Sequence, residues 1–180
     1  MATITPTADD DEFRLDRPAP EDGAALWQLV RDVGVLDQNS AYVYVIIGEA
    51  FAATSVVARR DGRLFGFVSG FRPPERPDVL FVWQVGVDSG ARGHGLAGRM
   101  LDDLVQRTVP VGVRWVETTV TPSNAASRAM FASLARRHSA TITESGGFAA
   151  ELFPGAGHEP ERLLRIGPFA TPRPIQGAPC

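Results

Sequence analysis

The stretch of residues 79–107 constrains the fold more than any other part of this chain. Residues 79–87 form a nearly unbroken β-branched and aromatic run, as expected of a strand that is buried on both faces. A glycine-rich segment follows, and apolar residues then recur at helical spacing at Leu96, Met100, Leu101, Leu104 and Val105. The pattern therefore predicts a strand, a tight loop and a helix.

The glycine loop has the features of a phosphate site. Backbone N–H groups at the start of a helix lack an intrahelical partner and lie at the positive end of its dipole. Gly93 and Gly95 allow the backbone to approach a phosphate closely, and Arg92 adds a positive charge. No Gly-Lys-Ser/Thr follows and Gly-x-Gly-x-x-Gly is incomplete, which disfavours the common nucleotide loops. The loop alone leaves an ordinary strand-to-helix turn as the alternative.

Length and composition bound the function classes. A chain of 180 residues favours one domain, placed here at residues 13–169 between a mobile tail at 1–12 and a Pro-rich tail at 170–180. The net charge of −3 and scattered arginines disfavour a nucleic-acid partner. The single cysteine, Cys180, and the spacing of the histidines predict no metal site. With neither a signal peptide nor a membrane-spanning run, we expect a cytoplasmic protein without a membrane partner.

The remaining elements follow from periodicity and turn signals. Helices are predicted at 20–33, 39–51 and 124–137, and strands at 13–16, 54–60, 63–72, 114–121, 141–144 and 161–166. The segment 42–47 is six consecutive apolar residues, so a buried strand is the alternative to the second helix. The order of elements predicts an α/β fold with a mixed central sheet flanked by helices.

Two motifs resemble the GNAT superfamily of N-acetyltransferases. The spacing Arg92-x-x-Gly95-x-Ala97 resembles its acyl-CoA pyrophosphate loop, and residues 120–127, Val-Thr-Pro-Ser-Asn-Ala-Ala-Ser, resemble its strand-to-helix segment. The resemblance implies a GNAT acyl-CoA N-acyltransferase fold with acetyl-CoA as cosubstrate, and an oxyanion-stabilising N–H at Val85. The CoA contacts that it implies are Val85, Val87, Arg92, Gly93, His94, Gly95, Leu96, Ala97, Asn124, Ser127 and Phe131.

Four further blocks narrow the resemblance. Residues 36–44, 54–58, 80–85 and 117–121 are similar to the diaminobutyrate acetyltransferases of ectoine biosynthesis, and the likeness extends over about residues 13–169. It implies acetyl transfer to the γ-amine of L-2,4-diaminobutyrate, giving the N-γ-acetyl product, without a metal and in a homodimer. A GNAT enzyme for another small amine and a non-catalytic acyl-CoA-binding module are the alternatives.

Such an acceptor carries two ammonium groups and one carboxylate, and only a neutral amine can attack a thioester. Carboxylates that could hold the ammonium groups are Asp37, Glu159 and Glu161. Trp83 is either a core residue or a wall for an ammonium group. The full predicted acceptor set is Asp37, Asn39, Tyr44, Trp83, Gln84, Thr119, Glu159 and Glu161.

The proton path departs from the family pattern. Phe131 stands where many GNAT enzymes carry a tyrosine that protonates the leaving thiolate, and the central strand has no Glu or Asp. Tyr42 or Tyr44 is the predicted substitute acid, unless the thiolate leaves without one. A water chain ending at Glu117 or Asp37 is the predicted route for deprotonating the amine.

Overall fold

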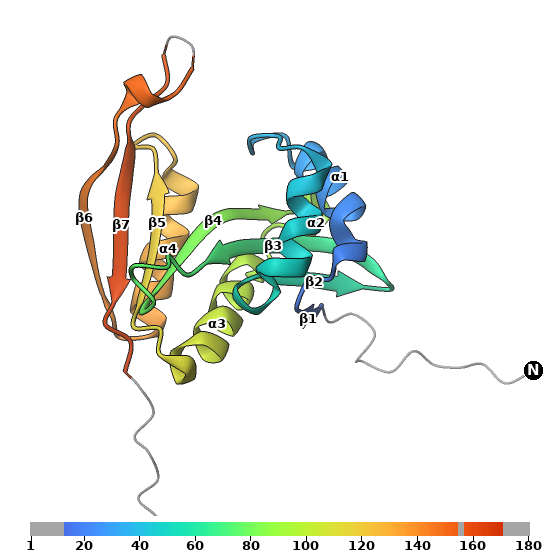
Figure 1. Ribbon diagram of the computed structural model, residues 1–180, viewed down its shortest axis with the longest axis horizontal. Helices are drawn as coiled ribbons and strands as arrows, with labels where there is room; N and C mark the ends of the chain where they lie inside the picture. The colour runs from blue at the N-terminus through green and yellow to red at the C-terminus, as the bar shows by residue number, and fades with distance from the viewer. Residues whose placement is uncertain (1–12, 155–156, 171–180) are drawn as a thin grey trace, which may run out of the picture. The chain divides into compact units, whose positions relative to one another are not determined.

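A computed structural model describes residues 13–154 and 157–170, which form two compact units. The first contains residues 13–69 and 84–103, and the second contains 70–83 and the described residues from 104 onward. The predicted tails fall on residues 1–12 and 170–180, of which only Ala170 is described. The strand order β1-β2-β3-β4-β5-β7-β6 makes the predicted mixed sheet (Figure 1).

The first unit pairs short antiparallel strands with two helices. Strand β1 (Arg14–Asp16) pairs with β2 (Val56–Arg60), which pairs with β3 (Arg63–Phe71). Helices α1 (Gly23–Val33) and α2 (Ala41–Ala50) lie side by side, and short 3-10 turns flank them at Pro20–Asp22 and Ala52–Thr54 (Figure 1). Their shared core consists of Leu26, Leu29, Val30, Val33, Tyr44, Ile47, Val57, Leu64 and Phe67.

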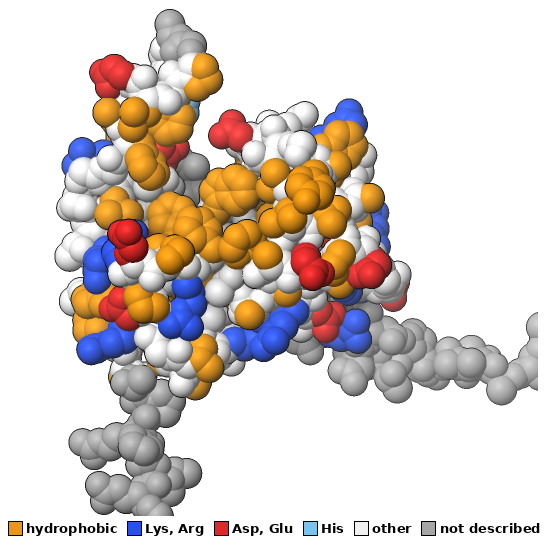
Figure 2. All heavy atoms as spheres, viewed as in Figure 1, with side chains coloured by type: hydrophobic (Ala, Val, Ile, Leu, Met, Phe, Trp, Pro, Cys, Tyr) orange, Lys and Arg blue, Asp and Glu red, His pale blue; other side chains and the backbone are white. Residues whose placement is uncertain are grey.

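Helix α2 settles the ambiguity of the apolar segment, because the strand alternative for residues 42–47 is wrong. Ser40 occupies the N-cap position with an extended backbone, although its side chain makes no capping bond. The helix is apolar on more than its buried side, and Figure 2 shows hydrophobic side chains over the α1–α2 region. Apolar residues on several faces of a short helix explain why periodicity alone left the assignment open.

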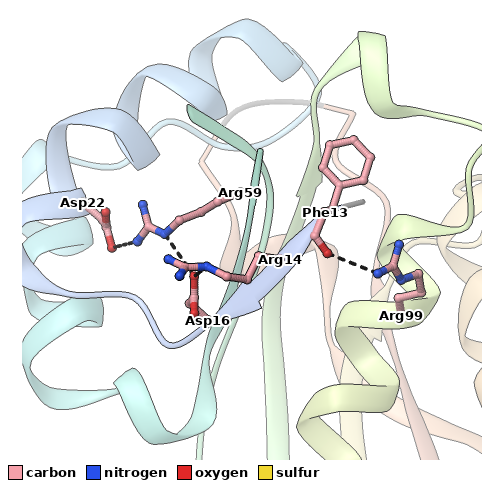
Figure 3. Close-up of polar contacts among 6 residues, drawn as sticks. All are labelled: Phe13, Arg14, Asp16, Asp22, Arg59 and Arg99. Atoms are coloured by element: carbon pink, nitrogen blue, oxygen red, sulfur yellow. Dashed lines mark hydrogen bonds and ion pairs between the residues drawn. The ribbon is translucent and has the colours of Figure 1, made fainter. Parts of the chain in front are cut away.

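Charged side chains fix the N-terminal strand (Figure 3). Arg59 Nη2 donates to Asp22 Oδ2 at 2.6 Å, and its Nε lies 3.5 Å from Asp16 Oδ2. Arg99 Nη2 donates to the backbone carbonyl of Phe13 at 3.2 Å. These contacts tie β1 to β2, to the turn before α1 and to α3 (Leu96–Thr108).

A close approach at Gly48 yields a stability prediction. A Cβ at this position would lie 2.3 Å from the carbonyl carbon of Ala19 and 2.5 Å from the nitrogen of Pro20. Because these are backbone atoms, the Gly48→Ala variant is expected to lose about 1–3 kcal/mol of unfolding free energy through overpacking. Urea denaturation measures the loss. The neighbouring exposed Glu49→Ala is the control and should stay within about 0.5 kcal/mol of wild type; equal stability of the two variants would contradict the close contact.

The second unit contains the other half of the sheet. Its part of β4 (Val79–Val87) pairs in parallel with β5 (Trp115–Val120), matching Val79–Phe81 to Trp115–Glu117. Strand β7 (Glu161–Gly167) is antiparallel to both β5 and β6 (Thr141–Phe148). Short 3-10 turns lie at Ser89–Ala91 in the first unit and at Val109–Val111 and Ala150–Leu152 in the second.

Helix α4 (Ala125–Arg137) defines one face of this half-sheet. Arg128 on α4 pairs with Glu144 on β6, and Glu144 lies opposite Leu164, which in turn lies opposite Thr118 on β5. Arg162 also contacts Glu144, and the two guanidinium groups hold the pKa of this exposed carboxyl below its usual range, Arg128 having the larger effect. Glu144, Leu164 and Thr118 thus lie on the face that α4 covers. Because neighbouring side chains on a strand point to opposite faces, Trp115, Glu117 and Thr119 on β5 face away from α4.

Strand β6 is longer than predicted. The sequence predicts a strand over 141–144 and a loop from Gly146, whereas β6 continues to Phe148 with an irregularity between Ser145 and Gly147. An added Cβ at Gly147 would lie 1.9 Å from the carbonyl oxygen of Glu161, so only glycine allows the neighbouring backbone this close.

Among the described residues, no helix has the length and apolar composition needed to cross a membrane.

Candidate active site

The glycine loop follows β4 in the first unit and is open. Asp88 shapes its start, since Oδ1 accepts from the Gly90 N–H at 2.8 Å and Oδ2 accepts from Arg63 Nη2 at 3.0 Å. Gly93 and Gly95 have φ angles of +81° and +70°, and a Cβ at either would meet nothing within 4 Å. The structure thus has the glycine conformation and open backbone that the phosphate-site prediction requires.

Arg92 connects this loop to its surroundings. Its Nε donates to the carbonyl of Val87 at 3.3 Å, and its Nη2 donates to the carbonyl of Val33, at the end of α1, at 3.5 Å. His94 is exposed, Leu96 is buried and Ala97 is half-buried. Leu96 therefore anchors the first turn of α3 while the loop before it stays accessible.

The segment between α1 and α2 contacts β4 close to Val85. Gln84 Nε2 donates to the carbonyl of Asp37 at 3.1 Å, and Asn39 Nδ2 donates to the same carbonyl at 3.4 Å. The Asp37 side chain is exposed. The buried Gln84 Oε1 has no hydrogen-bond partner among the described residues. The structure thus joins Asp37, Asn39 and Gln84, three of the predicted acceptor residues.

The two predicted tyrosines have different environments. Tyr42 is 68% exposed, whereas Tyr44 is fully buried and packs edge-on against Phe67 with ring centroids 6.5 Å apart. The Tyr44 hydroxyl is buried without a hydrogen-bond partner among the described residues. Tyr42 is therefore the accessible tyrosine for proton transfer.

Two predicted acceptor residues of the second unit share one face. Trp83 is 45% exposed, so the alternative that it is a core residue is wrong. Because Phe81 lies opposite Glu117 in the parallel register, the next alternate residues, Trp83 and Thr119, also point away from α4. Both strands continue beyond the matched residues, β4 to Val87 and β5 to Val120.

Glu117 lies on the same face and is fully buried. Its Oε2 accepts from Arg76 Nη1 at 2.5 Å, and its Oε1 accepts from Arg165 Nη1 at 2.8 Å. The Arg165 guanidinium carbon lies 4.2 Å from the ring centroid of Trp115. Each carboxylate oxygen of Glu117 therefore accepts from a different arginine. Glu117 thus holds two arginines in place, and its role as proton acceptor stays a prediction.

Asn124 caps the start of α4. Its Oδ1 accepts from the Ser127 N–H at 3.0 Å, the bond that an asparagine makes at an N-cap position. The preceding Ser123 donates to Glu159, so the start of α4 holds this predicted acceptor carboxylate, while Glu161 opens β7. Phe131 is buried in α4 and has no proton to donate.

Three contacts of the candidate site have no local signal in the sequence. The bond from Gln84 to the Asp37 carbonyl and the two bonds of Glu117 join residues 41 to 48 positions apart. Arg76 lies in a proline-rich loop and Arg165 in the last strand, and neither belongs to a motif. The one available signal is a glutamate inside the predicted strand 114–121, because a charged residue that becomes buried in a sheet needs partners.

Comparison with known proteins places these features in context. Residues 23–135 match the acetyltransferase (GNAT) family. The L-2,4-diaminobutyric acid acetyltransferase of Halalkalibacterium halodurans is 49% identical over 169 residues, covering 94% of this chain and 89% of that protein. The enzyme of the same name from Marinococcus halophilus is 48% identical over 159 residues, covering 88% and 92% respectively.

A solved structure agrees with these relatives. The diaminobutyrate acetyltransferase EctA from Paenibacillus lautus, in complex with its substrate L-2,4-diaminobutyric acid and coenzyme A, superposes with a TM-score of 0.84. It is 46% identical in sequence, and the match covers 88% of this chain and 96% of that one.

Proposed function

Because the chain belongs to the GNAT acetyltransferase family, within its diaminobutyrate acetyltransferases, we propose that it acetylates the γ-amine of L-2,4-diaminobutyrate with acetyl-CoA. The observation that carries this proposal is the 46% to 49% identity, over almost the whole chain, to proteins with that name, one of them solved with the diamine and coenzyme A. The reaction is a step of ectoine biosynthesis. Mass spectrometry of the diamine after incubation with acetyl-CoA tests it, since one acetyl group should be added only when enzyme is present.

The glycine loop holds the pyrophosphate of CoA. The N–H groups of Gly93, His94 and Gly95 and of the first turn of α3 donate to its oxygens, and Arg92 supplies a positive charge. Val85 and Val87 offer backbone groups to the pantetheine arm, as the family resemblance implies. In the second unit, Asn124, Ser127 and Phe131 at the start and middle of α4 are the proposed CoA contacts.

The acceptor binds through carboxylates and an aromatic wall. Asp37 in the first unit and Glu159 and Glu161 in the second are the proposed partners of its ammonium groups. The exposed ring of Trp83 offers its face to an ammonium or aliphatic segment, and Thr119 supplies a hydroxyl on the same face.

The chemistry is a direct attack of the neutral γ-amine on the thioester carbonyl. The carbon–nitrogen bond forms, the nitrogen loses a proton, and the carbon–sulfur bond breaks to release the CoA thiolate. The Val85 N–H stabilises the carbonyl oxygen as negative charge develops on it. Tyr42 is the proposed proton donor to the thiolate, and water leads the proton of the amine to Asp37.

Gln84 positions the segment that carries Asp37. Replacing Gln84 with methionine removes the bond to the Asp37 carbonyl and is expected to raise KM for diaminobutyrate about fivefold, the value of one hydrogen bond of about 1 kcal/mol. The dissociation constant for CoA, measured by calorimetry, should not change. A variant that weakens CoA to the same degree as the diamine would contradict the positioning role.

The assembly and location follow the same resemblance. We propose a cytoplasmic homodimer, because the reaction uses an intracellular cosubstrate and the family resemblance implies two chains. Strand β6 ends the sheet, and each of its residues is exposed, including the apolar Ile142 and Phe148. An exposed edge strand with apolar residues offers a contact surface for a second copy. Sedimentation equilibrium distinguishes one chain from two.

A further inference from the structure

The cluster of Arg76, Glu117 and Arg165 carries more positive charge than its internal pairing uses. The two guanidinium groups and one carboxylate leave a net charge of +1. Glu117 is buried, whereas the side chains of Arg76 and Arg165 are 48% and 35% exposed. The buried carboxylate thus holds two solvent-accessible cations in place.

The arginines also retain hydrogen-bonding capacity. Each guanidinium carries five N–H donors in a rigid fork, and Glu117 accepts from one nitrogen of each. Arg165 is further fixed by stacking over Trp115. A side chain whose position is already fixed loses little conformational entropy when an anion binds, so the cluster is preorganised for a carboxylate.

The cluster lies on the face that carries the proposed acceptor residues of the second unit. Glu117 and Thr119 are two residues apart on β5, and therefore about 7 Å apart along the strand. Arg165 is directly opposite Glu117 on β7, and Trp83 is two residues beyond the partner of Glu117 on β4.

The acceptor needs a positively charged partner as well as negatively charged ones. Its two ammonium groups are matched by carboxylates, but its α-carboxylate also needs a cationic partner once it leaves water. We propose that Arg165, held by Glu117 together with Arg76, binds the α-carboxylate of the acceptor and so selects diamino acids over plain diamines. This inference rests on the proposed function and adds a specificity element to it.

The test compares two acceptors that differ only in that carboxylate. 1,3-Diaminopropane has the amine spacing of L-2,4-diaminobutyrate without the carboxylate, and it is followed both as a substrate and as a competitive inhibitor. Arg165→Met is expected to lower kcat/KM for diaminobutyrate about 10- to 100-fold, mainly through KM, because one charge-assisted pair is lost. The kcat/KM or inhibition constant for diaminopropane should stay within about twofold, since that ligand makes no such pair.

Two further variants keep the result interpretable. Arg162→Met alters an arginine of the same strand on the α4 face, where it contacts Glu144, and both acceptors should be unaffected. The double variant Glu117→Gln, Arg165→Met removes the buried charge together with one of its two arginine partners. It should show the same loss for diaminobutyrate alone, with wild-type circular dichroism.

Three outcomes overturn the inference. If Arg165→Met lowers kcat/KM equally for diaminobutyrate and diaminopropane, the cluster only supports the fold. If it changes neither value, the α-carboxylate binds elsewhere. In both cases the wild type still acetylates diaminobutyrate and only this inference fails, whereas a wild type that is inactive on diaminobutyrate overturns the proposed function as well.

Discussion

Replacing Gly95 with valine is expected to raise the dissociation constant for CoA by about 100-fold, equivalent to losing two charge-assisted hydrogen bonds. Gly95 has a φ of +70°, which a β-branched residue rarely adopts, and its Cα faces open space that the proposed pyrophosphate fills. The valine side chain would occupy that space and displace the backbone donors. Isothermal titration calorimetry with CoA measures the effect.

Gly62 provides a matched control for backbone strain. It has a φ of +75° in the turn between β2 and β3, and a Cβ there also meets nothing within 4 Å. Gly62→Val and Gly95→Val should therefore lose similar stability, about 1–3 kcal/mol each. Only Gly95→Val should weaken CoA binding. Equal CoA affinities in the two variants would remove the glycine loop from the proposed cosubstrate site.

Replacing Asp37 with asparagine is expected to lower kcat/KM for diaminobutyrate about 10- to 100-fold, because a carboxylate that pairs with an ammonium group is lost. The backbone carbonyl of Asp37 is held by Gln84 and Asn39, while its side chain is exposed, so the substitution leaves the segment anchored. Steady-state kinetics with varied diamine at saturating acetyl-CoA measures the change.

Asp32→Asn makes the same charge change on α1 of the same unit. Asp32 accepts a hydrogen bond from Gln28 on the helix surface and has no proposed role, so kinetics should match wild type. If both variants lost activity equally, the effect of Asp37 would be one of net charge rather than of a direct ammonium contact.

The sequence predicts this protein best where one signal is local and repeated. The strand, glycine loop and helix from residue 79 onward were predicted in the correct order, because the hydrophobic period changes at Gly93 and Gly95. The N-cap bond of Asn124 follows from a preference that acts within one helical turn. Motif and fold together therefore lead from sequence to family.

The predictions fail where distant residues decide the outcome. The extension of β6 depends on Gly147 fitting against Glu161, and no pattern within 141–148 signals that register. The sequence also gives no sign of the two partners of Glu117, Arg76 and Arg165, each of which lies more than 40 residues away. Such pairings arise only when the sheet assembles.

Release of CoA thiol from acetyl-CoA, with L-2,4-diaminobutyrate set against ornithine, lysine and no amine, tests the proposed function most directly, with the acetylated position of the product read by NMR. We predict fast release with diaminobutyrate alone and an acetyl group on its γ-nitrogen. Release with a different amine, or tight CoA binding without release for any amine, would contradict this assignment and leave an acetyltransferase of other specificity or an acyl-CoA-binding module.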